Sequence, residues 1–580
     1  MAKVLLRLAC ILASLADVGF TTWTPIRPYK DPIIPGFNPD PSCTRVGDQF
    51  YCVNSSFNSF PGIPVYTSRD LINWEQIGKL IICNVLSRPE QLPQMAQIYG
   101  FTSGIWASTI RYNNGTFYVT TTLVWDKFAQ DDPMRWDNMM FTTRNIYGDN
   151  WSDPVHFSPG FQGYDVSLFW DDDGKTYVQG SHAWHVLPGI WQYEIDLSNG
   201  TIWNPEVLWT GTGGIAPEGP HVYKRDGYYY LLIAEGGTGL NHMVTMARSN
   251  GSIHGPYEPC AHNPVLTNAN TTEYLQTVGH ADVFEDTEGN VWAVALATRN
   301  GTWDYPMGRE TVLVAVAWEK DQYPLFNPFD PIRVTVDMAG PLPPPRPIPD
   351  GGTLVGHDQA ITFSANEPLP RQLVYLRLPT PSSYILSPPS HPNSLCLLGS
   401  AANLTGPDGM SGTSTFVGRR QEHVEFTSDV ILQFEPGQVG EEAGITVFLQ
   451  QLQHFDLGVV SLNSTAERYI RLKTTTKNST DGDMSDPLSL PGLVKLPESA
   501  GDSLKLKVQA VDASTYVFSY AEEGLRKPEW NVVGYGDASE VSGGFTGTII
   551  GMYATGNGRN STTSACFSTF SYRGVLNGYV

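Results

Sequence analysis

The sequence predicts an all-β protein, a five-bladed β-propeller followed by a β-sandwich. Two observations favour this fold class. Only 16% of the 580 residues are charged, while 12% are aromatic and the chain holds 56 Gly and 43 Pro. This composition is typical of short strands joined by tight turns. The second observation is a repeated hairpin pattern in the first 330 residues, and the total length exceeds what one core can hold.

The repeat consists of an apolar strand, a tight polar turn and an aromatic strand. Its five copies read CTRVGDQFYCV, TIRYNNGTFYVT, LFWDDDGKTYVQ, HVYKRDGYYYLL and VFEDTEGNVWAV. The turns at Asp48, Gly115, Gly174, Gly227 and Gly289 are 67, 59, 53 and 62 residues apart. Each interval has room for one four-stranded antiparallel blade, and five such units predict a five-bladed propeller.

The repeats also place large or ionisable side chains at one register. Counting nine residues back from the four turn glycines reaches Trp106, Asp165, Glu218 and His280. Counting eight back from the first turn reaches Asp40. In a propeller the first strand of each blade lines the central channel, so we expect these five side chains to converge there. Core packing alone does not select such a ring.

Each of these residues also has a purely structural interpretation. Asp40 in FNPDPS could belong to a turn, Asp165 could cap a strand, and Glu218 in APEGPH could lie in a solvated loop. His280 could be a satisfied core histidine, and Trp106 could fill the core. Three carboxylates at equivalent positions nevertheless favour a common site over coincidence.

Three converging carboxylates suit the cleavage of a glycosidic bond. One carboxylic acid protonates the leaving oxygen, and one carboxylate activates water or attacks the sugar. The acid needs a raised pKa, which burial or a nearby like charge provides. The third carboxylate can supply that tuning, and the chemistry requires no metal or other cofactor.

Seven motifs in chain order extend this interpretation. They are PIIPGFNPDPS, FPGIPVYTSRDLINW, GIWASTIRYNNGTFYVTTT, DVSLFWDDDGKTYVQG, APEGPHVYKRDGYYYLLIAEGGT, TVGHADVFED and MGRETVL. Through them residues 31–316 resemble glycoside hydrolase family 43, in its branch of β-xylosidases and α-L-arabinofuranosidases. The resemblance implies an inverting mechanism with Asp40 as general base, Glu218 as general acid and Asp165 as the residue that tunes and orients the acid.

The same resemblance implies a set of substrate contacts. Arg309 in MGRET corresponds to an arginine near the sugar hydroxyls, and Trp106 to the hydrophobic wall of the sugar subsite. Phe60 in SFPGIP corresponds to the loop that flanks the pocket. His280 in TVGHAD corresponds to a histidine of the central channel, which in some members contacts a calcium ion. A structural calcium in this channel is therefore a possibility.

The N-terminus has the pattern of a secretory signal peptide over residues 1–20. Lys3 and Arg7 precede the short apolar run Leu8–Leu15, and small residues follow it. A buried first strand or helix is the alternative. Eleven N-x-S/T sequons support export and glycosylation: Asn54, Asn114, Asn150, Asn199, Asn250, Asn270, Asn300, Asn403, Asn463, Asn478 and Asn560. We therefore expect a secreted, extracellular glycoprotein.

The domain boundaries follow from composition. The propeller should span residues 21–337, a Pro-rich extended linker 338–352, and a β-sandwich 353–580. FVGRRQEHVEF, EEAGITVF and GFTGTIIGMYATGNG resemble the C-terminal concanavalin A-like domain of the same xylosidase branch. The sandwich either binds carbohydrate itself or only shapes one edge of the funnel. We favour the second, with the segment Arg419-Arg420-Gln421 packing toward the propeller.

Six cysteines remain once Cys10 leaves with the signal peptide. Gly47-Asp48 is typical of a two-residue hairpin loop, and counting outward places Cys43 opposite Cys52. Opposed residues in a non-hydrogen-bonded pair lie within disulfide reach, so we predict a Cys43–Cys52 bridge. Two buried free thiols are the alternative.

The formal net charge of −22 disfavours non-specific binding to nucleic acid and to anionic membranes. The leading hypothesis is therefore a secreted, exo-acting glycosidase that releases xylose or arabinose from xylan or arabinoxylan. One alternative is a non-catalytic carbohydrate-binding propeller. Another is a fructan or sucrose hydrolase, which would carry an N-D-P-N-G-type nucleophile motif where this chain has N-P-D-P-S.

Overall fold

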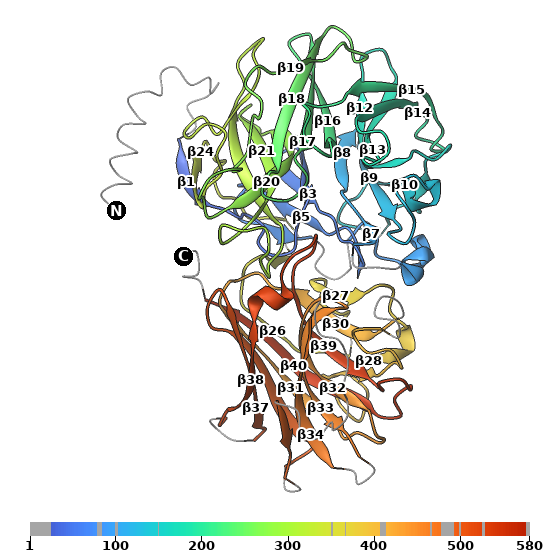
Figure 1. Cartoon of the computed structure of the whole chain (residues 1–580), viewed down its shortest axis with the longest axis vertical. Helices are drawn as coiled ribbons and strands as arrows, with labels where there is room; N and C mark the ends of the chain where they lie inside the picture. The colour runs from blue at the N-terminus through green and yellow to red at the C-terminus, as the bar shows by residue number, and fades with distance from the viewer. Residues whose placement is uncertain are drawn as a thin grey trace, which may run out of the picture.

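A computed structural model of the chain has two β-rich domains, a propeller above and a sandwich below in Figure 1. The structure describes residues 25–77, 84–98, 102–148, 150–349, 352–365, 367–406, 413–463, 467–476, 492–497, 500–524 and 528–575. The predicted signal peptide, Cys83 and the sequon at Asn478 lie outside these residues. No described helix has the length and hydrophobicity needed to cross a membrane.

Five antiparallel blades form the propeller, as the repeat predicts. Blade 1 has β2 (Ser42–Val46), β3 (Gln49–Val53), β5 (Val65–Ser68) and β6 (Glu75–Gln76); blade 2 has β8 (Thr109–Asn113), β9 (Thr116–Val124), β10 (Trp136–Thr143) and β11 (Val155–His156), with β7 (Gly104–Ile105) also on β9. Blade 3 has β12 (Gly163–Trp170), β13 (Thr176–His182), β14 (Ile190–Ile195) and β15 (Ile202–Trp209). Blade 4 has β16 (Glu218–Arg225), β17 (Tyr228–Glu235), β18 (Met243–Asn250) and β19 (Glu258–Pro259); blade 5 has β20 (Gln276–Glu285), β21 (Val291–Thr298), β22 (Glu310–Ala317) and β23 (Leu325–Phe326).

The first strands of the blades, β2, β8, β12, β16 and β20, contact one another in a closed ring around the channel. Their hairpins turn where the sequence predicts. In blade 2, Asn113 pairs with Thr116, and Asn114 and Gly115 have φ of 47° and 79°. Both central residues of a type I′ turn need positive φ, which Asn-Gly adopts at low cost.

The sandwich packs two large antiparallel sheets over one apolar core. One sheet holds β26 (Gln359–Ile361), β28 (Tyr384–Leu386), β29 (Leu395–Leu398), β31 (Phe426–Gln433), β36 (Ser503–Ala510), β37 (Thr515–Glu522), β38 (Asn531–Asp537) and β40 (Ser564–Gly574). The other holds β27 (Leu373–Leu376), β30 (Thr415–Arg420), β32 (Glu442–Gln450), β33 (Gln453–Ser461), β34 (Arg468–Thr475), β35 (Leu493–Lys495) and β39 (Ile549–Thr555). Burial alternates along β36, as expected for a strand with one face on the core.

Short strands tie the two domains together. Propeller strand β4 (Ser59–Phe60) pairs with β27 of the sandwich, and β25 (Thr353–Leu354), which follows the linker, pairs with β6 of blade 1. In addition, β1 (Arg27–Lys30) pairs with β24 (Asp337–Gly340), so the predicted linker begins inside a paired strand. The β4–β27 and β6–β25 hydrogen bonds fix how the sandwich sits against the propeller.

The described helices are short 3₁₀ turns, namely η2 (Pro89–Gln91), η3 (Pro93–Gln97), η4 (Pro133–Arg135), η5 (Pro381–Ser383) and η6 (Ala538–Val541).

One of the predicted glycosylation sites lies in the interior. Asn54 donates its amide to the backbone oxygens of Asn38 and Pro39 and is fully buried. A glycan cannot be carried at that sequon in the folded chain.

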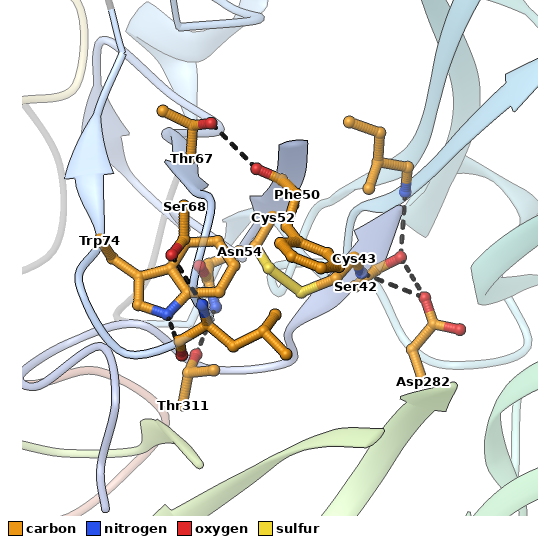
Figure 2. Close-up of a disulfide and its surroundings, with 12 residues drawn as sticks. Ser42, Cys43, Phe50, Cys52, Asn54, Thr67, Ser68, Trp74, Asp282 and Thr311 are labelled. Atoms are coloured by element: carbon orange, nitrogen blue, oxygen red, sulfur yellow. Dashed lines mark hydrogen bonds between the residues drawn. A yellow bond between two sulfur atoms is a disulfide. The ribbon is translucent and has the colours of Figure 1, made fainter. Parts of the chain in front are cut away.

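Two disulfides each join a pair of neighbouring β-strands. Cys43 and Cys52 are directly opposed in the first hairpin, as the predicted register requires, and their sulfurs are bonded (Figure 2). Phe50 and Trp74 belong to the same apolar cluster. The sequence offered no pairing for the second bridge, Cys396–Cys566, because its cysteines are 170 residues apart on β29 and β40.

Candidate active site

A pocket of about 320 Å³ lies at the channel end that faces the sandwich. All five residues of the predicted ring line this pocket, namely Asp40, Trp106, Asp165, Glu218 and His280. The structure therefore brings together all five side chains that the repeat places at one register. The remaining lining residues include Phe57, Gln130, Tyr164, Trp184, Ile215, Thr238, Trp303, Arg309 and Phe545.

Irregular backbone marks the ring positions. Asp40, Asp165 and His280 have φ of 52°, 57° and 49°, in the left-handed region that non-glycine residues rarely adopt. Register shifts interrupt the ladders between Tyr164 and Ser167 and between Glu218 and His221. A bulge re-aims a side chain, and backbone strain of this kind gathers at functional sites.

Asp40 is held as a carboxylate. Nη1 and Nη2 of Arg309 donate to its two oxygens at 2.8 and 3.3 Å, and Oγ of Ser55 donates at 2.5 Å. Burial opposes ionisation, but the charges of Arg309 and His280 and the bond from Ser55 together lower the pKa of Asp40 below its usual value. An ionised carboxylate in this position can accept a proton.

Glu218 has the opposite electrostatics. Burial, and then the negative charge of Asp40, raise the pKa of Glu218 to about 7, against smaller lowering effects of Arg309 and of the Tyr164 hydroxyl. The Tyr164 hydroxyl donates to Oε2 at 3.4 Å, at the limit of a hydrogen bond. Glu218 is therefore still largely protonated in mildly acidic solution and can donate a proton.

Asp165 is linked to Glu218 both through a backbone hydrogen bond and through charge. Its Oδ2 accepts a hydrogen bond from the backbone N–H of Gly219 at 3.0 Å, which fixes the chain next to Glu218. Burial, followed by the charges of Glu218 and Asp40, raises the pKa of Asp165 well above its usual range. A negative charge on Glu218 therefore favours the protonated form of Asp165.

His280 is buried between Asp40 and Asp165, with Nδ1 at 3.9 and 4.0 Å from their nearest oxygens. Burial lowers the pKa of His280, and the charge of Arg309 lowers it further, although the charge of Asp40 raises it. An imidazole at this position lines the pocket and can contact a bound sugar.

The described residues around His280 do not fit a calcium ion, which takes six to eight oxygen ligands. Both oxygens of Asp40 are already bound to Arg309 and Ser55. One layer deeper, the guanidinium of Arg111 bonds to both oxygens of Asp282 at 2.7 and 3.1 Å and therefore places a permanent positive charge in the channel. These side chains therefore do not support the structural calcium that the family resemblance suggested.

Aromatic side chains form the wall of the pocket. Trp106 packs edge-on against Tyr164 and Phe545, with ring centroids 5.5 and 5.8 Å apart, and Phe57 lies 6.1 Å from Phe545. Phe545 belongs to the sandwich, in the segment that extends to the propeller between η6 and β39 (Figure 1). The sandwich therefore shapes the pocket directly, through a residue that sequence reasoning missed.

The predicted role of Phe60 in the pocket is wrong. Phe60 pairs with Tyr375 of the sandwich in the β4–β27 ladder and packs into an apolar core instead. Phe57, three residues earlier and with φ of 47°, lines the pocket in its place. Phe57 stands just before the motif that carries Phe60, and only the strand pairing between the domains distinguishes the two phenylalanines.

The segment Arg419-Arg420-Gln421 packs toward the propeller, as expected, but does not line the pocket. The guanidinium of Arg420 lies 5.4 Å above the ring of Phe37. Oε1 of Gln421 accepts a hydrogen bond from the Thr548 hydroxyl at 2.7 Å, three residues from Phe545. These residues thus support the segment that carries the aromatic wall.

The rim of the pocket is apolar and open to solvent. Ile215 and Trp303 line the pocket and are 57% and 39% exposed, and Trp184, which follows β13 of blade 3, lines it as well. The Thr238 hydroxyl faces Nη1 of Arg309 at 3.1 Å. Exposed tryptophan and isoleucine at the mouth of a polar pocket are suited to the faces of further sugar rings.

Comparisons with known proteins agree with this geometry. Residues 29–324 match the model of glycosyl hydrolases family 43, and residues 360–573 match the beta xylosidase C-terminal concanavalin A-like domain. A non-reducing end alpha-L-arabinofuranosidase of Bacteroides ovatus is 34% identical over 98% of both chains, and a xylosidase/arabinosidase of Butyrivibrio fibrisolvens is 32% identical over 94% of this chain and 99% of its own. The solved xylan beta-1,4-xylosidase of Bacillus halodurans, 30% identical, superposes with a TM-score of 0.81 over 94% of this chain and 99% of that one. The chain belongs to glycosyl hydrolases family 43.

Proposed function

We propose that this chain is an inverting, exo-acting glycosidase that releases xylose or arabinose from the ends of xylan-type chains. One observation carries the proposal. Two carboxyl groups of one pocket are set to opposite protonation states, with the pKa of Asp40 lowered by Arg309 and that of Glu218 raised by burial. This is the division between base and acid that glycoside hydrolysis requires.

In the proposed reaction Asp40 takes a proton from a water molecule, whose oxygen attacks the anomeric carbon. Glu218 gives its proton to the glycosidic oxygen as the bond to the departing sugar breaks. Burial and the charge of Asp40 keep Glu218 protonated, and Asp165 orients it through the N–H of Gly219. Arg309 holds Asp40 in place and offers its one remaining N–H, on Nη2, to a sugar hydroxyl. No metal or cofactor takes part in this scheme.

The exo mode is supported by the shape of the pocket. Its volume is at the small end for a ligand site, and the aromatic wall of Trp106, Phe57 and Phe545 closes one side. A single terminal sugar can enter such a pocket, whereas the middle of a polymer cannot. The exposed Ile215 and Trp303 at the rim are placed to contact the sugar that leaves.

The substrate class rests on the relatives, whose names include both arabinofuranosidase and xylosidase activities. Xylose and arabinose are isomeric pentoses, so one pocket can accept both. Arabinoxylan carries both sugars and is our proposed natural substrate. A neutral polysaccharide is also compatible with a chain of formal net charge −22.

Export supports an extracellular substrate. The signal peptide pattern of residues 1–20 and the two disulfides fit an oxidising compartment, where such bonds persist. Mass spectrometry of the protein recovered from culture medium should find a mature chain that begins after residue 20. A product found only inside the cell would contradict secretion.

The decisive experiment is an NMR time course with an aryl β-xyloside and an aryl α-L-arabinofuranoside, followed by a product profile on arabinoxylan. Inversion predicts that the first free sugar has the anomeric configuration opposite to that of the substrate. Retention of configuration would reject the mechanism. Binding of xylo-oligosaccharides without release of sugar would favour a non-catalytic propeller instead.

A further inference from the structure

A second buried histidine stands beside the proposed acid. His242 lies in the turn before β18, and its imidazole is fully buried. Its Nδ1 is 2.9 Å from the backbone oxygen of Thr277. Because a carbonyl oxygen only accepts hydrogen bonds, Nδ1 carries the ring proton and Nε2 presents a lone pair.

That lone pair has no hydrogen-bond partner, and it faces the carboxyl group of Glu218. Nε2 of His242 lies 3.9 Å from Oε1 of Glu218. An unpaired polar atom in the interior costs free energy and calls for a physical reason. A protonated carboxyl group can pair with this nitrogen, whereas a carboxylate would oppose one lone pair with another.

The imidazole cannot change its role by taking up a second proton. Burial lowers the pKa of His242 to about 3, although the hydrogen bond with Thr277 acts against this shift. The ring is also held in place. A Cβ on Gly279 would lie 2.4 Å from Cε1 of His242, the backbone N–H of His242 donates to Gly239 at 3.0 Å, and the Thr267 hydroxyl donates to its carbonyl at 2.9 Å.

We propose that His242 is a positioning residue for the general acid: its Nε2 accepts a hydrogen bond from protonated Oε1 of Glu218 and thereby keeps this carboxyl protonated and oriented between turnovers. The inference rests on the proposed function. The Tyr164 hydroxyl already faces Oε2, so Oε1 is the oxygen left for His242. Such bonds are often long before substrate binds and shorten in the reacting complex.

The hydrogen bond also accounts for recovery of the acid. When Glu218 gives its proton to the glycosidic oxygen, the carboxylate is left facing the lone pair of Nε2. This contact favours uptake of the next proton from solvent. The other charged and titratable groups that face Glu218 are Tyr164 and Asp165 on β12, together with Asp40, His280 and Arg309. Substitution of His242 alone leaves these groups unchanged.

Two matched variants test the proposal. In His242→Asn the shorter amide can still donate to Thr277, but no acceptor reaches Glu218. In His242→Gln the amide oxygen reaches the place of Nε2 and restores the acceptor. For His242→Asn we expect the alkaline limb of the pH profile of kcat/KM to move down by about one pH unit, since the acid loses a bond made only in its protonated form. His242→Gln should restore most of the wild-type profile.

The leaving group separates positioning from simple structural support. For substrates with poor leaving groups, such as disaccharides, His242→Asn should lower kcat by about 10- to 100-fold, a part of what general acid catalysis supplies. Dinitrophenyl glycosides depart with little protonation and should lose less than about threefold. An equal loss for both substrates with an unmoved alkaline limb would overturn the proposal.

A neutron crystal structure of the unmodified protein tests the same idea without any substitution and without activity. At about pH 5 a proton should lie between Oε1 of Glu218 and Nε2 of His242, with a second on Nδ1. A proton on Nε2 and none on Nδ1 would refute the inference. An unmodified enzyme that hydrolyses no pentoside would refute the proposed function instead, so the two failures are distinguishable.

Discussion

The backbone oxygen of Phe545 accepts a hydrogen bond from Nε of Arg309 at 3.2 Å. The same guanidinium donates from Nη1 and Nη2 to Asp40. The sandwich domain is thus one residue away from the carboxylate that we propose as the base. The ring of Phe545 lies 5.2 Å from the guanidinium and completes the aromatic wall beside Trp106. The second domain therefore forms part of the pocket.

Phe545→Ala should weaken substrate binding more than chemistry. Loss of the ring removes apolar contact that we expect to be worth about 1–2 kcal/mol, which corresponds to a rise in KM of roughly tenfold. The backbone bond to Arg309 does not depend on the side chain, so kcat should change less. Steady-state kinetics on an aryl pentoside will measure both quantities. Phe545→Leu, which keeps apolar bulk, is the control, and an unchanged KM in the alanine variant would contradict the assignment.

Substitution of the proposed base and of the proposed acid should have different signatures. Asp40→Asn should lose about 10⁴-fold in kcat with every leaving group, because attack by water needs the base in each case. Glu218→Gln should lose a similar factor on disaccharides but much less on dinitrophenyl glycosides. Both variants should remain folded, as circular dichroism and thermal unfolding will show. Full activity in either variant would exclude that residue from its role.

The sequence determines the ring of the site, including Trp106, but not the rest of its aromatic wall. The distance from an inner-strand start to the hairpin turn is nearly constant among blades, so a count along the chain correctly brings Asp40, Asp165, Glu218 and His280 together. Phe545 enters the pocket through packing between domains, which no local pattern reports. Only the two-residue pairing of β4 with β27 distinguishes Phe60, which lies in that pairing, from Phe57, which lines the pocket. His242 carries no repeat signal, because it lies in an irregular turn.

Chelation should not affect this enzyme, because the side chains around His280 do not fit a calcium ion. The channel already contains the Arg111 guanidinium, bound to Asp282 in the interior. A calcium ion close to this charge would be repelled, and the oxygens of Asp40 are occupied. We therefore expect dialysis against EDTA to leave kcat/KM and Tm unchanged. Loss of activity that added calcium restores would show that the enzyme does hold a functional metal.

The two disulfides should differ in their effect on stability. Cys396 and Cys566 close a loop of 170 residues, whereas Cys43 and Cys52 close one of nine. Loop-closure entropy assigns about 5 kcal/mol to the long loop and about 2.5 kcal/mol to the short one. The double variant Cys396→Ser/Cys566→Ser should therefore lower the Tm more than Cys43→Ser/Cys52→Ser. Differential scanning calorimetry will compare them, and the reverse order would contradict the entropic argument.

The pH profile of kcat/KM should show how Arg309 affects the pKa of Asp40. Against the opposing effect of burial, Arg309 lowers the pKa of Asp40, so removal of the guanidinium charge in Arg309→Gln must raise that pKa. The base works only when ionised, and the acidic limb of kcat/KM should therefore move to higher pH, by about 1–3 units as for other paired aspartates. Arg309 also lowers the pKa of Glu218, so the alkaline limb should move up as well. Arg309→Lys keeps the charge but loses the two-pronged geometry, and it should lower kcat with a much smaller shift of either limb. An acidic limb that stays in place in Arg309→Gln would mean that Asp40 is not the group that titrates there.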